Sequence, residues 1–73
     1  MRTLDKVKIG EDVEIVKIHG SSLVKRRIMD MGMTRRTHVQ VVKFAPLGDP
    51  MELKVRGYQL SLRKADAKNI EVI

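Results

Sequence analysis

The sequence contains no cysteine and few aromatic residues, and each shortage excludes a class of protein. Without cysteine the chain has neither a disulfide framework nor a thiolate metal site, so buried apolar residues must stabilise the fold. Phe44 and Tyr58 are its aromatic residues, too few for the base-stacking platforms of single-strand nucleic-acid binders. No apolar run approaches the length of a membrane-spanning helix, and the N-terminus lacks the apolar block of a signal peptide. These absences predict an intracellular protein.

The residues that are abundant favour a small β-rich domain. A chain of 73 residues has room for one core, which predicts a single domain over residues 1–73. Valine and isoleucine, with nine and six residues, outnumber the six leucines, and branching at Cβ favours strands over helices. The 15 Lys and Arg residues against nine Asp and Glu give a net charge of +6. Such a charge suits nucleic acid, an anionic membrane surface or an acidic protein partner, and it also serves solubility alone.

Two segments change the phase of their apolar pattern half-way along. Residues 13–18 and 39–44 both follow the order apolar, polar, apolar, apolar, polar, apolar. Because side chains alternate between the two faces of a strand, each switch predicts a bulge or a sharp bend. Strands that bend in this way contribute to two sheets of a small, strongly curved barrel.

One helix is expected between these two strands. Ser21 or Ser22 can cap its N-terminus, and Gly32 can supply the positive φ that often ends a helix. The apolar stripe of this helix follows the i, i+4, i+7 spacing and consists of Val24, Ile28 and Met31. The cations at 25–27 lie off this stripe, so the helix is expected to present a basic outer surface.

Turn residues and alternating strands make up the second half of the chain. Residues 46–50 have the proline and glycine of a strand connection, and residues 51–56 alternate between apolar and charged side chains. Gly57 permits a bulge or tight bend before the alternation resumes. A single helical turn over 64–68 and a closing strand over 69–73 complete the expected fold.

The sequence offers no pattern for metal binding or covalent chemistry. His19 and His38 lie far apart, and neither has a carboxylate or a second histidine at the spacing that a zinc site needs. The serines lack a nucleophile motif, and the carboxylates are scattered among cations. We therefore predict no catalytic residue, no metal ligand and no cofactor.

Clustered cations leave nucleic-acid binding open as an alternative function. The clusters are Lys25–Arg27, Arg35–Arg36 and Arg63–Lys64, and phosphate contacts from them would show no sequence preference. Phe44 and Tyr58 are both expected in the core, Tyr58 with its hydroxyl at the surface. Neither ring would then be free to stack on a base, which disfavours this alternative.

Leu47 is the apolar residue of the loop between Pro46 and Pro50. The loop serves as a plain strand connection in one interpretation. In the other, the two prolines hold Leu47 on a rigid exposed tip, which loses little entropy when it docks on a partner.

Several motifs in order resemble those of one family. They are residues 27–33, Ala45–Pro50, Val55–Tyr58 and Leu60–Lys64, and together they resemble the FeoA family, the small cytoplasmic accessory proteins of bacterial ferrous iron transport. The resemblance extends from about Leu4 to Val72. A related fold occurs as the C-terminal domain of iron-dependent repressors of the diphtheria-toxin-repressor type.

The resemblance implies a mainly β fold, a small SH3-like barrel. Its short α-helix would follow the first long strand, and a short helical turn would precede the last strand. It further implies a non-enzymatic protein that acts on FeoB, a membrane transporter with a cytosolic GTP-binding domain. The chain would then be cytoplasmic and peripheral at the inner face of the membrane when bound. The family often has Pro-Gly at Arg35-Arg36, so either this turn is built differently or Arg36 carries modest strain.

The predicted contact surface combines the basic helix, the proline loop and a basic rim. Cations at the rim of an interface speed association, whereas a buried apolar anchor supplies affinity. Ile28 belongs equally to the core stripe, and the core is the favoured of its two interpretations. The predicted partner-binding residues are Lys25, Arg26, Arg27, Ile28, Leu47, Arg63 and Lys64. A nucleic-acid-binding barrel and a metal-responsive domain stay open as alternatives, and exposed strand edges allow weak self-association.

Overall fold

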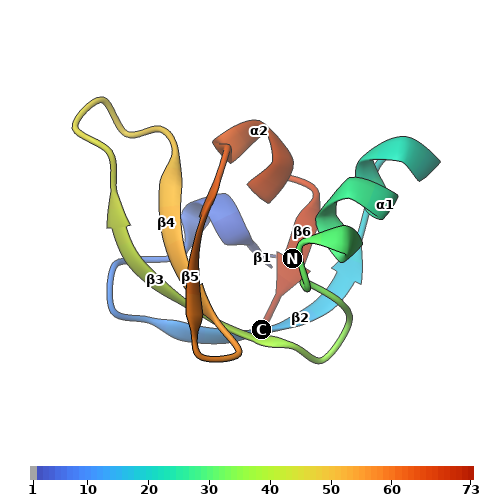
Figure 1. Ribbon diagram of the computed structural model, residues 1–73, viewed down its shortest axis with the longest axis horizontal. Coiled ribbons are helices and arrows are strands. Elements are labelled where there is room, and N and C mark those ends of the chain that lie inside the picture. Colours follow the sequence, from blue (N-terminus) through green and yellow to red (C-terminus); the bar gives the residue numbers. More distant parts are fainter. Residues whose placement is uncertain (1) are drawn as a thin grey trace.

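Six antiparallel strands and two short α-helices form the fold in the computed structural model, which describes residues 2–73 (Figure 1). The strands lie in the order β1-β6-β2-β3-β4-β5. This confirms the mainly β prediction, with one helix after the first long strand and a helical turn before the last. The elements are β1 (Arg2–Thr3), the 3-10 turn η1 (Leu4–Lys6), β2 (Asp12–Ile18), α1 (Ser22–Asp30), β3 (His38–Phe44), β4 (Met51–Val55), β5 (Tyr58–Leu62), α2 (Lys64–Ala67) and β6 (Ile70–Val72).

Both predicted phase switches are irregularities in strand pairing. β2 pairs with β3 through Asp12–Glu14 and with β6 through Ile15–Ile18, and its register shifts between Ile15 and Lys17. In the pairing of β3 with β4 the register shifts between Val41 and Lys43. β2 thus pairs with β3 through its first half and with β6 through its second half, and the bulge beside this change curves the sheet on itself as expected.

The signals for the helix ends are confirmed. The hydroxyl of Ser21 accepts the N–H of Val24 at 3.3 Å, which satisfies one free donor at the start of α1. Gly32 follows the helix with φ +90, and its N–H donates to the carbonyl of Met29 at 2.9 Å. Of the apolar stripe, Ile28 is fully buried, while Val24 and Met31 are partly buried against the core.

A two-residue turn joins β4 to β5. Val55 is opposite Tyr58, and the intervening Arg56 and Gly57 both have positive φ, at +50 and +85. Two left-handed residues in succession produce the tight turn whose twist matches that of the strands. The predicted tight bend at Gly57 is therefore confirmed.

The prediction that Tyr58 packs in the core is wrong. Its side chain is 44% exposed, and its hydroxyl donates to the carbonyl of Met31 at 2.5 Å. The ring crosses the surface from β5 to the end of α1, where a Cβ at Gly32 would collide with the hydroxyl. Its hydroxyl therefore satisfies a carbonyl at the helix C-terminus, a group that the helix itself leaves without a partner. Phe44 is partly buried against the core, as expected.

The turn that leads into β3 has Arg36 at φ +73, so the strained alternative is the one observed. The N–H of Arg36 donates to the carbonyl of Ile15 at 2.6 Å, and the N–H of Ile15 donates to the carbonyl of Thr37 at 2.9 Å. These bonds tie the turn to β2 at its bulge. They hold a residue that has a Cβ in a conformation that glycine adopts without cost.

The core lies inside the curved sheet and is closed by α1, α2 and η1. Its fully or nearly fully buried members are Leu4, Val7, Val13, Ile15, Ile28, Met33, Val39, Val41, Met51, Leu53, Val55, Leu62, Ala67, Ile70 and Val72. β1 and β5 are the sheet edges, and Arg2 at the first edge is opposite Val72 of β6. Among residues 2–73 no helix has the length and apolar character that crossing a membrane demands.

Candidate partner-binding surface

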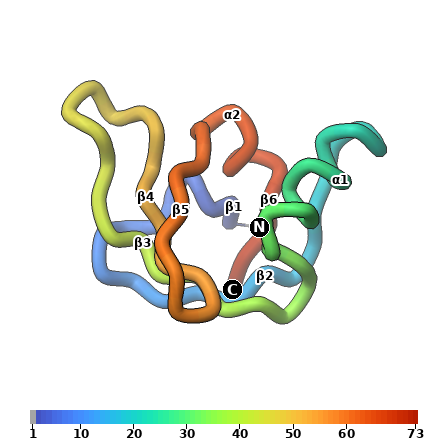
Figure 2. The backbone as a smooth tube through the Cα atoms, viewed as in Figure 1, coloured from blue at the N-terminus to red at the C-terminus, as the bar shows by residue number. Residues whose placement is uncertain are grey.

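The segments that carry the predicted site lie along one rim of the fold. Helix α1, helix α2 and the loop between β3 and β4 all extend from the upper side of the sheet in Figure 1, and the backbone tube shows the same arrangement (Figure 2). The rim therefore gathers parts of the chain that are distant in sequence: Arg27 and Asp66, which contact each other there, are 39 residues apart.

The helix separates the three consecutive cations of its basic cluster. Successive residues of an α-helix point about 100° apart, so one cluster in sequence covers three sides of α1. Lys25 lines a groove next to β2. Arg26 lies on the outer face beside Leu23, and Arg27 lines the cleft toward α2.

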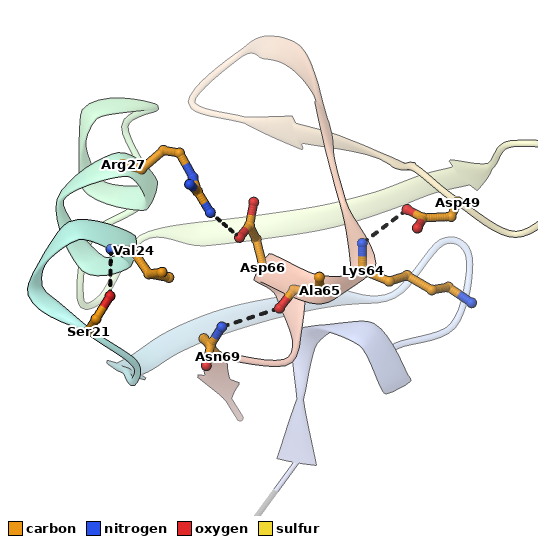
Figure 3. A network of polar contacts seen from close by, with 8 residues as sticks. All are labelled: Ser21, Val24, Arg27, Asp49, Lys64, Ala65, Asp66 and Asn69. Carbon is orange, nitrogen blue, oxygen red and sulfur yellow. Dashed lines mark hydrogen bonds and ion pairs between the residues drawn. The ribbon is translucent and has the colours of Figure 1, made fainter.

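The cleft between α1 and α2 contains an internal ion pair. Arg27 Nη2 lies 2.6 Å from Asp66 Oδ1, with the Arg27 side chain 54% exposed and that of Asp66 15% exposed (Figure 3). Arg63 and Ser61 line the other wall of this cleft, which encloses about 400 Å³. One of the predicted partner-binding cations is thus already engaged within the domain.

The proline loop is fixed at its base and free at its tip. The Asp49 carboxylate accepts the N–H of Lys64 at 3.0 Å, which joins the loop to α2 (Figure 3). The Lys64 ammonium lies 5.1 Å from the centre of the Phe44 ring, within range of a cation–π contact. Leu47 at the tip is 97% exposed, so its side chain is available to a partner.

Ile28 does not belong to the surface. It is fully buried in the core beneath α1, so the core interpretation of this residue is the correct one. A partner cannot contact it without displacing the helix. The exposed apolar residues of α1 are instead Leu23 and Met29.

A second groove lies on the opposite side of α1, between the helix and β2. It encloses about 480 Å³ and is lined by Val16, Lys17, Ile18, Lys25, Met29 and Arg35. No carboxylate lines it, and its three cations form no ion pair with any residue of the described part of the chain. The sequence did not reveal this groove because its residues come from a strand, a helix and a turn.

Both histidines have carboxylate neighbours that their sequence positions did not show. His19 Nε2 lies 3.0 Å from Glu71 Oε1. His38 Nδ1 lies 3.4 Å from Asp12, and its Nε2 lies 3.9 Å from Glu14. The two nitrogens of an imidazole point apart, and within residues 2–73 no three such groups converge on a point where a metal ion could bind.

A further ion pair lies away from the rim, near the start of the chain. Glu11 accepts the N–H of Lys8 at 3.1 Å, and Arg2 Nη1 lies 2.7 Å from its carboxylate. The hydrogen bond from Lys8, followed by that from Arg2, holds the pKa of Glu11 below its ordinary value of 4.5.

The family model described as the FeoA domain matches residues 2–73. The chain belongs to the FeoA family. It is 36% identical, over 69 residues, to a Fe(2+) transport protein A/Fe(2+) transporter FeoB fusion protein of Porphyromonas gingivalis. That match covers 94% of this chain and 8% of the fusion protein. The FeoA family is associated with ferrous iron transport, as the sequence resemblance implied.

Solved structures agree with this membership. An FeoA-like protein from Clostridium acetobutylicum is 46% identical, with a TM-score of 0.91, and the match covers 97% of this chain and 83% of that one. Stenotrophomonas maltophilia FeoA, described as a procaryotic SH3 domain protein in complex with zinc, is 22% identical with a TM-score of 0.84 over 100% and 91% of the two chains. At that identity the likeness concerns the fold, and the SH3-like prediction is confirmed.

The predicted relation to metal-dependent repressors is also one of fold. A manganese-dependent transcriptional repressor superimposes with a TM-score of 0.88 at 15% identity. The match covers 99% of this FeoA-family chain and 40% of the repressor. A shared fold does not carry a shared function.

Proposed function

We propose that this FeoA-family domain is a non-enzymatic accessory protein of ferrous iron uptake, which acts by binding the cytosolic part of a FeoB-type transporter. The observation that carries the proposal is the P. gingivalis relative, in which an FeoA-like segment and a FeoB transporter belong to one chain. Joining two modules raises the effective concentration of each for the other. Fusion therefore favours pairs whose function depends on contact.

The proposed contact surface is the rim formed by the outer face of α1, the α1–α2 cleft and the proline loop. Leu47 supplies an exposed apolar tip at one end of the rim, Arg63 lines a hollow with loop residues Asp49 and Pro50, and Arg26 lies on α1 at the other end (Figure 1). An apolar anchor on the same surface as several cations suits a partner with a complementary acidic surface. Lys64 extends this rim at the base of the loop.

Binding to the transporter would place the chain in the cytoplasm, at the inner face of the cell membrane. The cations of the rim would then lie near anionic lipid headgroups. Each well-placed cation would add about 1 kcal/mol to membrane association. A weak protein contact would be prolonged in this way.

The test is co-purification with the cytosolic domain of the FeoB transporter from the same organism. Leu47→Ser and Arg26→Glu, both at exposed positions, should each weaken the complex several-fold while the fold is retained. Lys54→Glu changes charge as Arg26→Glu does, on the exposed face of β4 away from the rim, and should leave binding unchanged. An absence of any complex with the unaltered chain would exclude transporter contact. Equal binding by all variants would exclude the rim.

A further inference from the structure

We propose that the groove between β2 and α1 is a second binding site, which takes an acidic segment bearing apolar side chains. We place that segment on the transporter, a step that rests on the function proposed above. The site is distinct from the rim because the body of α1 separates the two. Lys25 lines this groove, whereas Arg27 lies on the α2 side.

The groove is positively charged. Lys17, Lys25 and Arg35 bring three positive charges to one groove, and none has an ion pair with another described residue. The lining of the groove contains no carboxylate, so carboxylates of a partner would meet three charges of the opposite sign there. By contrast, the cleft on the other side of the helix has its own carboxylate in Asp66.

The groove also has an apolar lining. Val16, Ile18 and Met29 form the rest of the groove, and Met29 is 46% exposed although it lies on a helix that buries its neighbour Ile28. Methionine adapts its shape to irregular apolar partners. A partner that supplied carboxylates alone would leave this apolar area in contact with water.

The same lining argues for a protein segment rather than a nucleic acid. Single-strand binders place aromatic rings beside their cations, and the aromatic residues of this chain lie elsewhere. Tyr58 contacts the end of α1 from β5, and Phe44 lies beneath Lys64. An acidic segment with leucine or phenylalanine side chains matches both the charge and the apolar lining of the groove.

Three synthetic peptides of equal length test the chemistry of the groove by NMR titration of the 15N-labelled chain. One combines glutamate and leucine, the second replaces each leucine by serine, and the third replaces each glutamate by lysine. The first should shift the amides of residues 16–18, 25, 29 and 35, and the other two should bind at least tenfold more weakly. Shifts that are equal for the first two peptides, or that fall outside the groove, would overturn the proposal. Tighter binding of single-stranded DNA at these amides would also overturn it.

Matched variants test whether the transporter uses the groove. The double variant Lys17→Glu/Arg35→Glu reverses two exposed charges of the groove, and Lys8→Glu/Lys54→Glu reverses two exposed charges elsewhere. The first should weaken binding of the transporter's cytosolic domain at least tenfold, and the second should leave it within twofold. Met29→Ser removes apolar contact without a change of charge and should weaken binding severalfold. The NMR spectrum of each variant verifies that its fold is intact.

The outcomes separate this proposal from the proposed function. A transporter domain that binds the unaltered chain and both double variants equally would overturn the groove proposal and leave the proposed function standing. A groove that binds the glutamate–leucine peptide in a chain that does not bind the transporter would support the chemistry of the site. That second result would overturn the proposed function and the placement of the segment on the transporter.

Discussion

The two sides of α1 differ in how their cations are neutralised. On the α2 side, Arg27 is paired with Asp66. On the β2 side, Lys17, Lys25 and Arg35 have no carboxylate within their groove. The paired side contributes to the fold, because its ion pair joins the two helices. The unpaired side contributes nothing of this kind, so its charge is available to another molecule.

The difference shows that a cluster in sequence is not a cluster in space. Lys25 and Arg27 are two residues apart, which directs them about 200° apart around a helix. Lys17 and Arg35, both distant in sequence from Lys25, share its groove instead. Grouping cations by their neighbours in the structure therefore separates structural charges from those free to bind.

The largest expected effect comes from Ile28, which anchors α1 in the core. Its removal should affect both the α2 side and the β2 side of the helix. Ile28→Ala leaves a cavity beneath the helix and should lower the free energy of unfolding by about 2–5 kcal/mol. In a domain of this size the melting temperature should fall by about ten degrees or more. Leu23→Ala, on the same helix but 74% exposed, should change it by less than about 0.5 kcal/mol. Thermal unfolding followed by circular dichroism measures both, and equal losses would contradict the anchoring role of Ile28.

Altering Gly32 should destabilise the fold through the Tyr58 hydroxyl that contacts the end of α1. Gly32 and Gly10 have nearly the same φ, +90 and +88, so alanine at either should cost about 1–2 kcal/mol. Gly32→Ala should cost about 1 kcal/mol more, since the added Cβ displaces the Tyr58 hydroxyl from its carbonyl. Urea denaturation gives both values. In a Tyr58→Phe background, where the hydroxyl is absent, the difference should largely disappear; an undiminished difference would mean that the hydroxyl is not its cause.

The turn that supports Arg35 on the β2 side should become more stable when its strain is removed. Arg36→Gly removes the Cβ that strains this residue at positive φ, and part of this gain is offset by the greater freedom of glycine in the unfolded chain. We expect the free energy of unfolding to rise by up to about 1 kcal/mol. Arg35→Gly, at a neighbour without positive φ, should lower it by about 0.5–1 kcal/mol. Chemical denaturation of both variants measures the contrast, and a loss of stability on Arg36→Gly would contradict the strain.

Neutralising one charge on each side should change stability in opposite directions. Asp66→Asn removes the partner of the half-exposed Arg27 and should destabilise by less than about 1 kcal/mol. Lys25→Gln removes one of three like charges that line the groove, in a chain of net charge +6, and should stabilise by about a few tenths of a kcal/mol. Both effects should shrink as salt is added. Denaturation at low and high salt measures both effects. Effects of the same sign would contradict the difference between the paired and the unpaired side.

The smallest expected effect concerns the ion pair of Glu11 with Arg2. This pair lies away from α1 and serves as a second example of a cation that is paired within the domain. The pKa of Glu11 is lowered in the folded state, so its stabilising contribution is complete above the unfolded value near 4.5 and is lost as pH falls through the folded value. Glu11→Gln should therefore lose slightly more stability at neutral pH than in acid. Unfolding at pH 7 and pH 3 measures the difference, and a penalty that grew in acid would contradict the lowered pKa.

Local patterns were sufficient to predict much of the fold. The phase switches at Ile15 and Val41 predicted the two bulges, because alternation of side chains is a property of one strand. Ser21 and Gly32 marked the helix ends for equally local reasons. Tyr58 was misplaced because its hydrogen bond to Met31 depends on how β5 and α1 meet. No pattern within one strand or helix contains that information.

The candidate site was less predictable for the same reason. An exposed tip was one of two interpretations of the loop that carries Leu47, and its side chain is exposed there. The partner of Arg27 lies 39 residues away, and the groove of Lys25 joins three separate elements. Sequence can identify which cations exist, but pairing between distant elements decides which remain free.

The pairing of β1 with β6 has a consequence for how the chain could be connected. Arg2 is opposite Val72, so the first and last strands of the described residues are neighbours in the sheet, away from the loop at 45–50 (Figure 1). A short glycine-rich linker could join them, and new ends could then be opened in that loop, where Leu47 is exposed. The order of the strands in space would be unchanged although their order along the chain would differ. The fold is thus compatible with more than one linear arrangement of the same segments.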